Sequence, residues 1–238
     1  MVGGIMNGTC NYILDSMTRL GLDYGEALSQ AQALGYAERN PSTDVDGIDT
    51  WHKLILSANI AFGVSLERDG VPAAGISKIS AADVSNFADH GYICKLVSHG
   101  TQNEGVYSAF VQPTLFSQGA LEAAVPTNFN LITLDGEVSG RQSFYGQGAG
   151  RYPTAYNVVQ DCVSLLSGKG FYCPYGKKVA VDNSCTRRYY VRGAQDAWLE
   201  SVTAETWNGA VVTAPVAVSD MHAWLKENPD AFIAAIAE

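Results

Sequence analysis

The segment Ala31–Lys53, AQALGYAERNPSTDVDGIDTWHK, gathers charged side chains immediately ahead of an apolar run, LILSANIAF. Only 16% of the 238 residues are charged, yet this segment holds Glu38, Asp44, Asp46, Asp49 and Lys53. Charged groups lose solvation when they approach an apolar core, so such a cluster needs partners or a ligand. The segment is therefore the first place to look for a functional site.

Helical patterns flank this segment on both sides. Apolar residues at helical spacing predict helices over residues 7–20 and 23–34, the second with Gly35 as its C-cap residue. Asn40 and Pro41, with Gly47 just after, predict a loop over residues 36–46. A third helix is predicted over residues 48–62, and its apolar residues lie nearly all round, as in a central, buried helix.

Strand patterns dominate the middle of the chain. A short helix over residues 81–87 is expected to begin after the N-cap residue Ser80. Runs of β-branched and aromatic residues then predict antiparallel strands in YICKLVSHG, GVYSAFVQPTL, NLITLDGEV and RQSFYG. A Gly-rich turn leads into a helix over residues 153–166, where Pro153 suits the first turn.

The last part of the chain predicts a small β-rich unit. A linker, SGKGFYCPYGKK, precedes a strand in RRYYVRG, and Asn208-Gly209 predicts a hairpin between LESVTAETW and AVVTAPVAV. A capped helix in SDMHAWLKENP and a final strand or helix in AFIAAIAE follow. We expect domains at 1–183 and 184–238 and an α+β fold, with helices packed on a mixed, mostly antiparallel sheet.

Composition excludes several classes of function. A net charge of −9 and a pI of about 4.8 disfavour binding to nucleic acid or to an anionic membrane. The apolar runs are shorter than a membrane helix requires, and MVGGIMNGTC lacks the pattern of a signal peptide. Five scattered cysteines suggest reduced thiols in a cytoplasmic protein, and four histidines without ligand spacing predict no metal site.

Asp49 and Lys53 lie four residues apart and so share one face of the predicted helix. The simpler interpretation is a solvent-exposed pair of little energetic value. Because an apolar run follows Lys53, we expect instead a partly buried lysine that can exchange a proton near neutrality. The loop carboxylates could bind a cationic group of a substrate, such as an amine.

Two glycine-containing segments at predicted helix starts are further candidates. Gly146, Gly148 and Gly150 could expose backbone N–H groups to an anion, or could form a structural turn. Their spacing does not match the G-x-G-x-x-G dinucleotide fingerprint. Gly8 and Thr9 open the first helix, where capping by Thr9 is favoured over contact with a ligand.

Taken together, these residues resemble the homoserine dehydrogenase family. GIMNGTCNYIL at Gly4–Leu14 resembles the start of its catalytic domain, and Ala31–Lys53 fits the family signature at every fixed position. FYGQGAGRYPTAYNVVQD at Phe144–Asp161 resembles its Gly-x-Gly-Ala-Gly segment. The resemblance covers residues 3 to about 170. The tail from about residue 187 is similar to an ACT regulatory domain whose first helix is missing.

The resemblance implies the reduction of aspartate semialdehyde to homoserine with NADP or NAD as cofactor. Lys53 matches the lysine that donates a proton to the nascent alkoxide. Glu38 and Asp49 match carboxylates that hold the substrate amine and ordered water. The other matching positions are Tyr36, Asp44, Gly8 and Thr9 for the substrate, and Gly146, Gly148, Ala149 and Gly150 for the cofactor.

One feature of the family has no counterpart in this sequence. Relatives carry a Rossmann domain before the Asn-Gly-Thr start, and no strand-GxGxxG-helix pattern occurs here. We therefore expect the chain alone to bind NAD(P) poorly and to lack turnover. Expected partners are a small-molecule substrate and further copies of the chain, as a homodimer or larger oligomer. The alternatives are a non-catalytic amino-acid-binding or regulatory module and, less favoured, a hydrolase.

Overall fold

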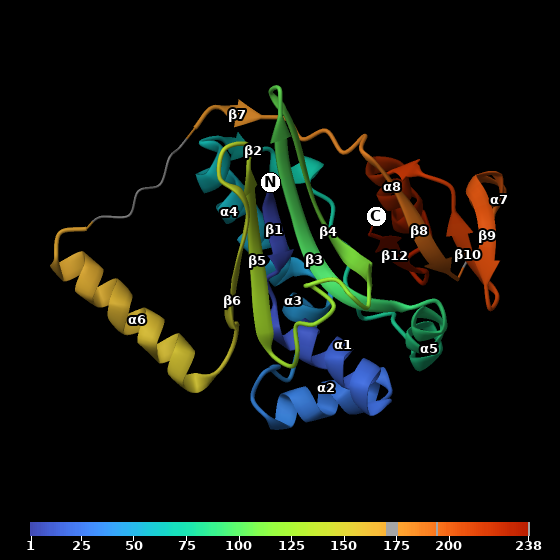
Figure 1. Cartoon of the computed structure of the whole chain (residues 1–238), viewed down its shortest axis with the longest axis horizontal. Coiled ribbons are helices and arrows are strands. Elements are labelled where there is room, and N and C mark those ends of the chain that lie inside the picture. Colours follow the sequence, from blue (N-terminus) through green and yellow to red (C-terminus); the bar gives the residue numbers. More distant parts are fainter. Residues whose placement is uncertain (170–175, 194, 238) are drawn as a thin grey trace.

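The computed structural model describes residues 1–169, 176–193 and 195–237, and it is built on one long mixed sheet. Ten strands belong to this sheet, which runs in the order β6-β5-β1-β3-β4-β12-β8-β10-β9 while β11 pairs with β8 (Figure 1). The pairings are antiparallel except for β12 with β4. The expected α+β class, with helices on a mostly antiparallel sheet, is confirmed.

The first helices follow the predicted boundaries closely. Helix α1 (Gly8–Leu20) ends at Gly21, and α2 (Tyr24–Ala33) begins with a capping box from Asp23. The C-cap of α2 is Leu34, and the left-handed residue expected there, Gly35, comes one position later. Helix α5 (Ala81–Asp89) begins with the predicted Ser80 cap.

Two local predictions around the charged segment are wrong. The loop expected at residues 36–46 contains a one-turn helix, α3 (Ser42–Val45). Helix α4 (Ile48–Phe62) is not buried all round, because its outward side leaves Leu56 and Ile60 about three-fifths exposed. Its inward side, including Leu54 and Ala58, packs on the sheet.

The predicted strands of the central region are confirmed. Strands β3 (Tyr92–Asn103) and β4 (Val106–Ser117) pair along their whole length, and β5 (Phe129–Gly136) pairs with β6 (Gly140–Gln147). Strand β1 (Val2–Ile5) joins the two hairpins by pairing with β3 on one side and β5 on the other. The short strands β2 (Ser65–Leu66) and β7 (Lys178–Val179) form a separate parallel pair, and a 3-10 turn (Arg68–Gly70) follows β2.

The C-terminal unit contains a helix between its first two strands that we did not expect from the resemblance to ACT domains. Its elements are β8 (Thr186–Arg192), α7 (Ala197–Val202), β9 (Thr203–Trp207), β10 (Ala210–Thr213), β11 (Val216–Ala217), α8 (Val218–Glu227) and β12 (Phe232–Ile236). The six-residue helix α7 therefore follows β8, where no helix was expected, and part of LESVTAETW is helical. The hairpin at Asn208-Gly209 is confirmed, with φ values of 47° and 90°.

The last helix and strand of this unit follow the prediction only in part. The segment AFIAAIAE, for which a strand or a helix was expected, forms the strand β12. Helix α8 begins after Ala217 without a side-chain cap, contrary to the capped start that we expected. The predicted linker SGKGFYCPYGKK lies partly outside the described residues. Strand β12 pairs with β4, so the sheet continues through the expected boundary at residue 183.

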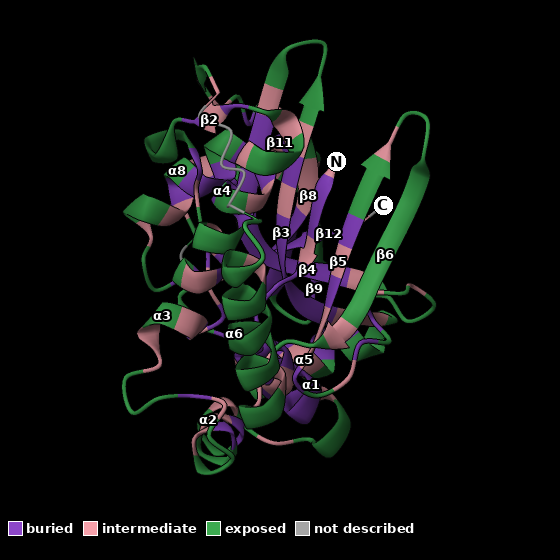
Figure 2. Ribbon diagram, turned by 90° about the vertical axis from the view of Figure 1, so that its left-hand side faces the viewer, coloured by how far each residue is buried: buried purple, intermediate pink, exposed green. Residues whose placement is uncertain are grey.

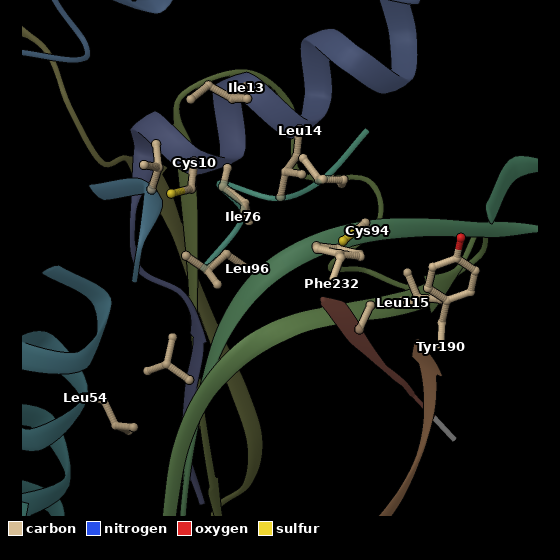
Figure 3. Close-up of a cluster of buried hydrophobic side chains, with 14 of the residues drawn as sticks. Cys10, Ile13, Leu14, Leu54, Ile76, Cys94, Leu96, Leu115, Tyr190 and Phe232 are labelled. Atoms are coloured by element: carbon tan, nitrogen blue, oxygen red, sulfur yellow. The ribbon is translucent and has the colours of Figure 1, made fainter. Parts of the chain in front are cut away.

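The core lies between the sheet and helices α1, α4 and α5. Figure 3 shows Cys10, Ile13 and Leu14 of α1 above the sheet residues Leu96 and Leu115. The C-terminal unit also contributes buried residues to this cluster, among them Tyr190 and Phe232. Because the C-terminal strands share this core, they gain apolar contacts that a unit of their size could not supply alone.

Helix α6 (Arg151–Leu166) stands apart from this core. None of its residues is buried, and it stands away from the sheet in Figure 1 and is almost entirely exposed (green) in Figure 2. Its exposed apolar and aromatic residues are Tyr152, Tyr156, Val158, Val159, Val163, Leu165 and Leu166. Among the described residues, no helix combines the length and the apolar character needed to cross a membrane.

Candidate active site

The charged segment forms a compact site where α3 meets α4. Gly47 lies between the two helices with φ of 81°, a left-handed conformation that lets α4 start directly after α3. This turn places Asp44, in α3, beside Asp49, in the first turn of α4. A carboxylate at this position also interacts favourably with the helix dipole.

Lys53 is held at the edge of the site by two oxygen atoms. Its Nζ atom lies 2.7 Å from Asp49 Oδ2 and donates to the Met6 carbonyl at 3.0 Å. Its side chain is 45% exposed, so the burial that we expected of this lysine is wrong. An ammonium group has three N–H donors, so one remains available to a ligand oxygen.

Asn7 connects the two carboxylates. Its Nδ2 atom donates to Asp44 Oδ1 at 2.7 Å and to Asp49 Oδ2 at 2.8 Å. Its Oδ1 atom accepts from the Cys10 backbone N–H at 2.8 Å and caps α1. The sequence analysis did not select Asn7, although asparagine before a helix is among the best N-cap residues.

Thr9 does not cap its own helix, contrary to the interpretation favoured from sequence. Its hydroxyl donates to the Tyr36 backbone carbonyl at 2.6 Å, and the Tyr36 ring lies against Tyr12. The bond ties the start of α1 to the loop that carries Glu38. Two of the residues expected to bind substrate, Thr9 and Tyr36, are thereby brought into contact.

The site has an excess of negative charge. Burial raises the pKa of Asp44 above its usual value, the Asn7 hydrogen bond opposes this shift, and the charges of Asp49 and Glu38 add to it. Glu38 is close enough to act electrostatically, but its side chain is exposed and its backbone carbonyl accepts from Gln32. Lys53 offsets part of this negative charge, and a second cation bound near Asp44 would offset more.

Cys10 lies directly beneath the carboxylates. Its thiol donates to the Asp44 carbonyl at 3.1 Å. Burial raises the pKa of the Cys10 thiol well above its usual value, and the charges of Asp44 and Asp49 raise it further. The thiol therefore stays protonated and serves as part of the core rather than as a nucleophile.

The glycine loop, residues 146–150, lies beside the start of α1. Asn128 holds it with two bonds, accepting from the Gly148 N–H at 3.1 Å and donating to the Ala149 carbonyl at 2.8 Å. A Cβ atom added to Gly8 would come within 2.7 Å of the Asn128 carbonyl oxygen. Gly8 is therefore required for close packing between α1 and the segment that carries the glycine loop.

The glycine loop leaves an uncovered helix start. Gly150 adopts φ of 134° as the N-cap residue of α6 and supplies no side-chain cap. A Cβ atom on Gly148 would lie 2.2 Å from the Asn130 amide, so this loop has no room for a side chain there. The Gly148 N–H is already bonded to Asn128, whereas the N–H groups of Ala149 and Gly150 form no hydrogen bond within the described parts of the chain. These two N–H groups could hold a phosphate group of a nucleotide, with Gly148 leaving the loop free of a side chain.

A buried lysine supports the segment that carries Asn128. Lys95 Nζ donates to Asn11 Oδ1 at 2.9 Å and to the Val125 carbonyl at 2.6 Å. Asn11 Nδ2 is within hydrogen-bond distance of four carbonyls between residues 125 and 129. Burial lowers the pKa of Lys95 to about 8. Neither Lys95 nor Asn11 was selected from sequence, because each of their partners lies at least thirty positions away.

Oxygen, nitrogen and sulfur groups do not gather into a metal site here. Within residues 1–169, 176–193 and 195–237, no group of three or more His, Cys, Asp and Glu side chains could hold a metal ion. The arrangement instead offers one ammonium donor beside several carboxylates, with the glycine loop nearby. It can bind a cationic ligand and donate a proton to an oxygen atom.

Comparison with known proteins agrees with this geometry. The homoserine dehydrogenase family profile matches residues 1–163. A homoserine dehydrogenase from Synechocystis is 39% identical over 194 residues, covering 79% of this chain and 44% of that protein. A homoserine dehydrogenase from Pseudomonas aeruginosa is 43% identical over 166 residues, covering 69% of this chain and 38% of that protein. The chain therefore spans about two fifths of the length of these curated relatives.

Solved structures extend the similarity to the C-terminal unit. A homoserine dehydrogenase from Thiobacillus denitrificans matches all of this chain and 64% of that chain, with a TM-score of 0.80 and 25% identity. A hyperthermophilic archaeal homoserine dehydrogenase mutant in complex with NADPH shares the fold over 72% of this chain, with a TM-score of 0.56 and 23% identity. The chain belongs to the homoserine dehydrogenase family.

Proposed function

We propose that this chain supplies the substrate-binding part of an NAD(P)-dependent homoserine dehydrogenase, which reduces aspartate semialdehyde to homoserine. The observation that carries the proposal is the position of the Lys53 ammonium, fixed between Asp49 and the Met6 carbonyl with one donor free. The family membership supports the choice of reaction. The contacts of the site support the residue roles.

The substrate amine would be held by the acidic part of the site. Asp44 keeps an oxygen atom beside Asn7, and its environment is negative because Asp49 and Glu38 lie nearby. An ammonium group bound there would offset the negative charge of these carboxylates. Glu38 is exposed in this structure, so its contribution would be electrostatic or would follow movement of its side chain.

Lys53 would act at the other end of the substrate. A bound nicotinamide cofactor would supply the hydride to the aldehyde carbon. The carbonyl oxygen gains negative charge as it becomes an alkoxide, and Lys53 Nζ would donate its free proton to that oxygen, giving the hydroxyl of homoserine. Asp49 keeps the ammonium oriented and offsets its charge throughout.

The cofactor would extend from the glycine loop. Gly148, Ala149 and Gly150 are the residues that we infer would hold it, because their backbone is uncovered and a side chain at Gly148 would not fit. NADP and NAD are both compatible with these contacts. A helix that buries none of its residues, as α6 does, is marginal in water. We infer that α6 is covered in the intact enzyme by the part of the relatives' length that this chain does not match.

Further properties are proposed from the same resemblance. We infer that residues 184–238 form a reduced ACT-like regulatory domain and that residues 1–183 form the substrate domain. Apart from the two-residue strand β11, the elements of the C-terminal unit follow the order strand-helix-strand-strand-helix-strand, which supports an ACT-like topology. A homodimer or larger homo-oligomer, a cytoplasmic location and a role in threonine and methionine biosynthesis complete the proposal.

The proposed function is tested with two proteins. The first is the 238-residue chain, and the second is the same chain joined after the N-terminal part of the Pseudomonas aeruginosa relative. We expect the chain alone to show no saturable NADPH binding and no homoserine oxidation, because no described element forms a dinucleotide-binding unit. We expect the joined protein to bind NADPH, measured by fluorescence, and to oxidise homoserine.

The outcome that would contradict the proposal is a folded joined protein that binds NADPH without oxidising homoserine. If that protein instead bound amino acids without turnover, a non-catalytic binding module would be favoured. Micromolar NADPH binding with turnover by the 238-residue chain alone would refute the expected need for a further domain.

A further inference from the structure

A cavity lined by none of the residues around Lys53 lies at the seam between the central strands and the C-terminal unit. Strand β12 pairs in parallel with β4 and antiparallel with β8, so these three strands lie side by side (Figure 1). A cavity of about 260 Å³ opens on this seam. The lining residues that matter are His99, Phe110, Gln112, Phe116, Arg187 and Ala235.

Gln112 directs a hydrogen-bond donor toward this cavity. The residue is 1% exposed. Its Oε1 atom accepts from the Tyr189 hydroxyl at 3.2 Å and lies 2.9 Å from His222 Nε2, which must therefore carry a proton. The amide nitrogen forms no hydrogen bond within the described parts of the chain. Since the oxygen faces Tyr189 and His222, the unpartnered N–H groups are left for the cavity.

Arg187 brings a positive charge to the same place. One of its guanidinium nitrogens donates to the Thr186 carbonyl at 2.7 Å. In residues 1–169, 176–193 and 195–237, no acidic group forms an ion pair with it. The next residue, Arg188, points to the other face of the strand and pairs with Glu205 at 2.6 Å. An arginine without an acidic partner is notable in a chain of net charge −9.

His99 adds a neutral donor. Its half-buried ring stacks on Phe110 with the ring centres 4.9 Å apart. Burial, together with the positive charge of Arg187, lowers the pKa of His99 to about 4. The imidazole is therefore uncharged near neutrality and carries a single N–H. No Asp or Glu occurs among the described residues that line the cavity.

We propose that this cavity binds a short-chain aliphatic carboxylate. Arg187 provides the charge, and Gln112 and His99 provide further N–H donors to the carboxylate oxygens. Phe110, Phe116 and Ala235 provide the apolar surface for the hydrocarbon chain. A free amino acid fits less well, because its ammonium group would lose solvation beside Arg187 without an acid to accept it.

The test uses the full 238-residue chain with butanoate as the probe. Binding is measured by calorimetry and by changes in the NMR signals of the side-chain amides. We expect saturable binding with a Kd at or below about 10 mM. We expect 2-aminobutanoate and inorganic phosphate to bind at least about tenfold more weakly, since the first adds an unpaired cation and the second lacks the apolar chain.

Arg187→Gln is expected to weaken butanoate binding by at least about tenfold, because it removes the charge. Gln112→Glu, which replaces the amide donor by an acceptor, is expected to do the same in protein whose fold is verified by circular dichroism. The matched control is Arg188→Gln, which alters the adjacent arginine on the opposite face and should leave the Kd unchanged.

Three results would overturn the proposal. One is the absence of saturable butanoate binding to the folded chain. Another is equal affinity in the wild type and Arg187→Gln. The third is a change of oligomeric state in Arg187→Gln, seen by size-exclusion chromatography, without any binding of butanoate, which would make this face a contact between copies of the chain. None of these measurements depends on homoserine turnover, so the proposal can fail independently of the proposed enzyme activity.

Discussion

Replacing Lys53 by alanine is expected to lower kcat for homoserine oxidation by about 10²- to 10⁴-fold, the range typical of a lost general acid–base group. The enzyme used is the chain joined to a cofactor domain. The change removes the ammonium that lies 2.7 Å from Asp49 and leaves Asp44 and Asn7 in place to bind the amine. We therefore expect KM to change by no more than about twofold, which would separate proton transfer from substrate binding.

The matched control for this variant is Lys78→Ala. Lys78 is also a half-exposed lysine with one carboxylate partner, Asp230 at 3.1 Å, but it lies outside the site. Its replacement should leave kcat unchanged. If Lys53→Ala retained wild-type turnover, or if Lys78→Ala lost it equally, Lys53 would not be the proton donor.

His222 is expected to make the fold sensitive to acid. The residue is 4% exposed, and burial lowers the pKa of His222 to about 4, from an unfolded value near 6.5. Between these two values the unfolded chain binds a proton that the folded chain does not. The free energy of unfolding should therefore fall by about 3 kcal/mol from this group as the pH falls from 6.5 to 4.

Urea unfolding at pH 7 and pH 4 measures this contribution. We expect His222→Gln to reduce the loss of stability between the two pH values by about 3 kcal/mol, because glutamine does not titrate and can still donate to Gln112. The control is His52→Gln, since His52 is exposed. A pH dependence that is identical in His222→Gln and the wild type would show that this imidazole is not held neutral by the fold.

The local elements of this fold could be predicted because their signals are short-range. Gly21 ends α1, Ser80 begins α5, and Asn208-Gly209 forms the hairpin, each through contacts within a few residues. The close position of Lys53 and Asp49 was predicted for the same reason, since one helix carries both. Periodicity alone thus placed Lys53, the residue that we propose as the proton donor, beside Asp49.

The remaining features depend on contacts that are distant in sequence. Asn7 reaches across thirty-seven positions to Asp44, and Lys95 reaches Asn11 across eighty-four. The exposure of α6 and of the outer side of α4 was not foreseen, because an apolar pattern shows that a helix has something to bury but not where its partner is. Family resemblance supplied the reaction, which spacing alone could not.

The proposed function requires that Asp44 belongs to a pocket for the substrate amine. Calorimetric titration of homoserine into the 238-residue chain tests it without any cofactor. We predict saturable binding that Asp44→Asn weakens by at least about tenfold, whereas Asp46→Asn, which changes an exposed acid two positions away, binds as the wild type does. Equal affinity of the wild type and Asp44→Asn for homoserine would contradict the account.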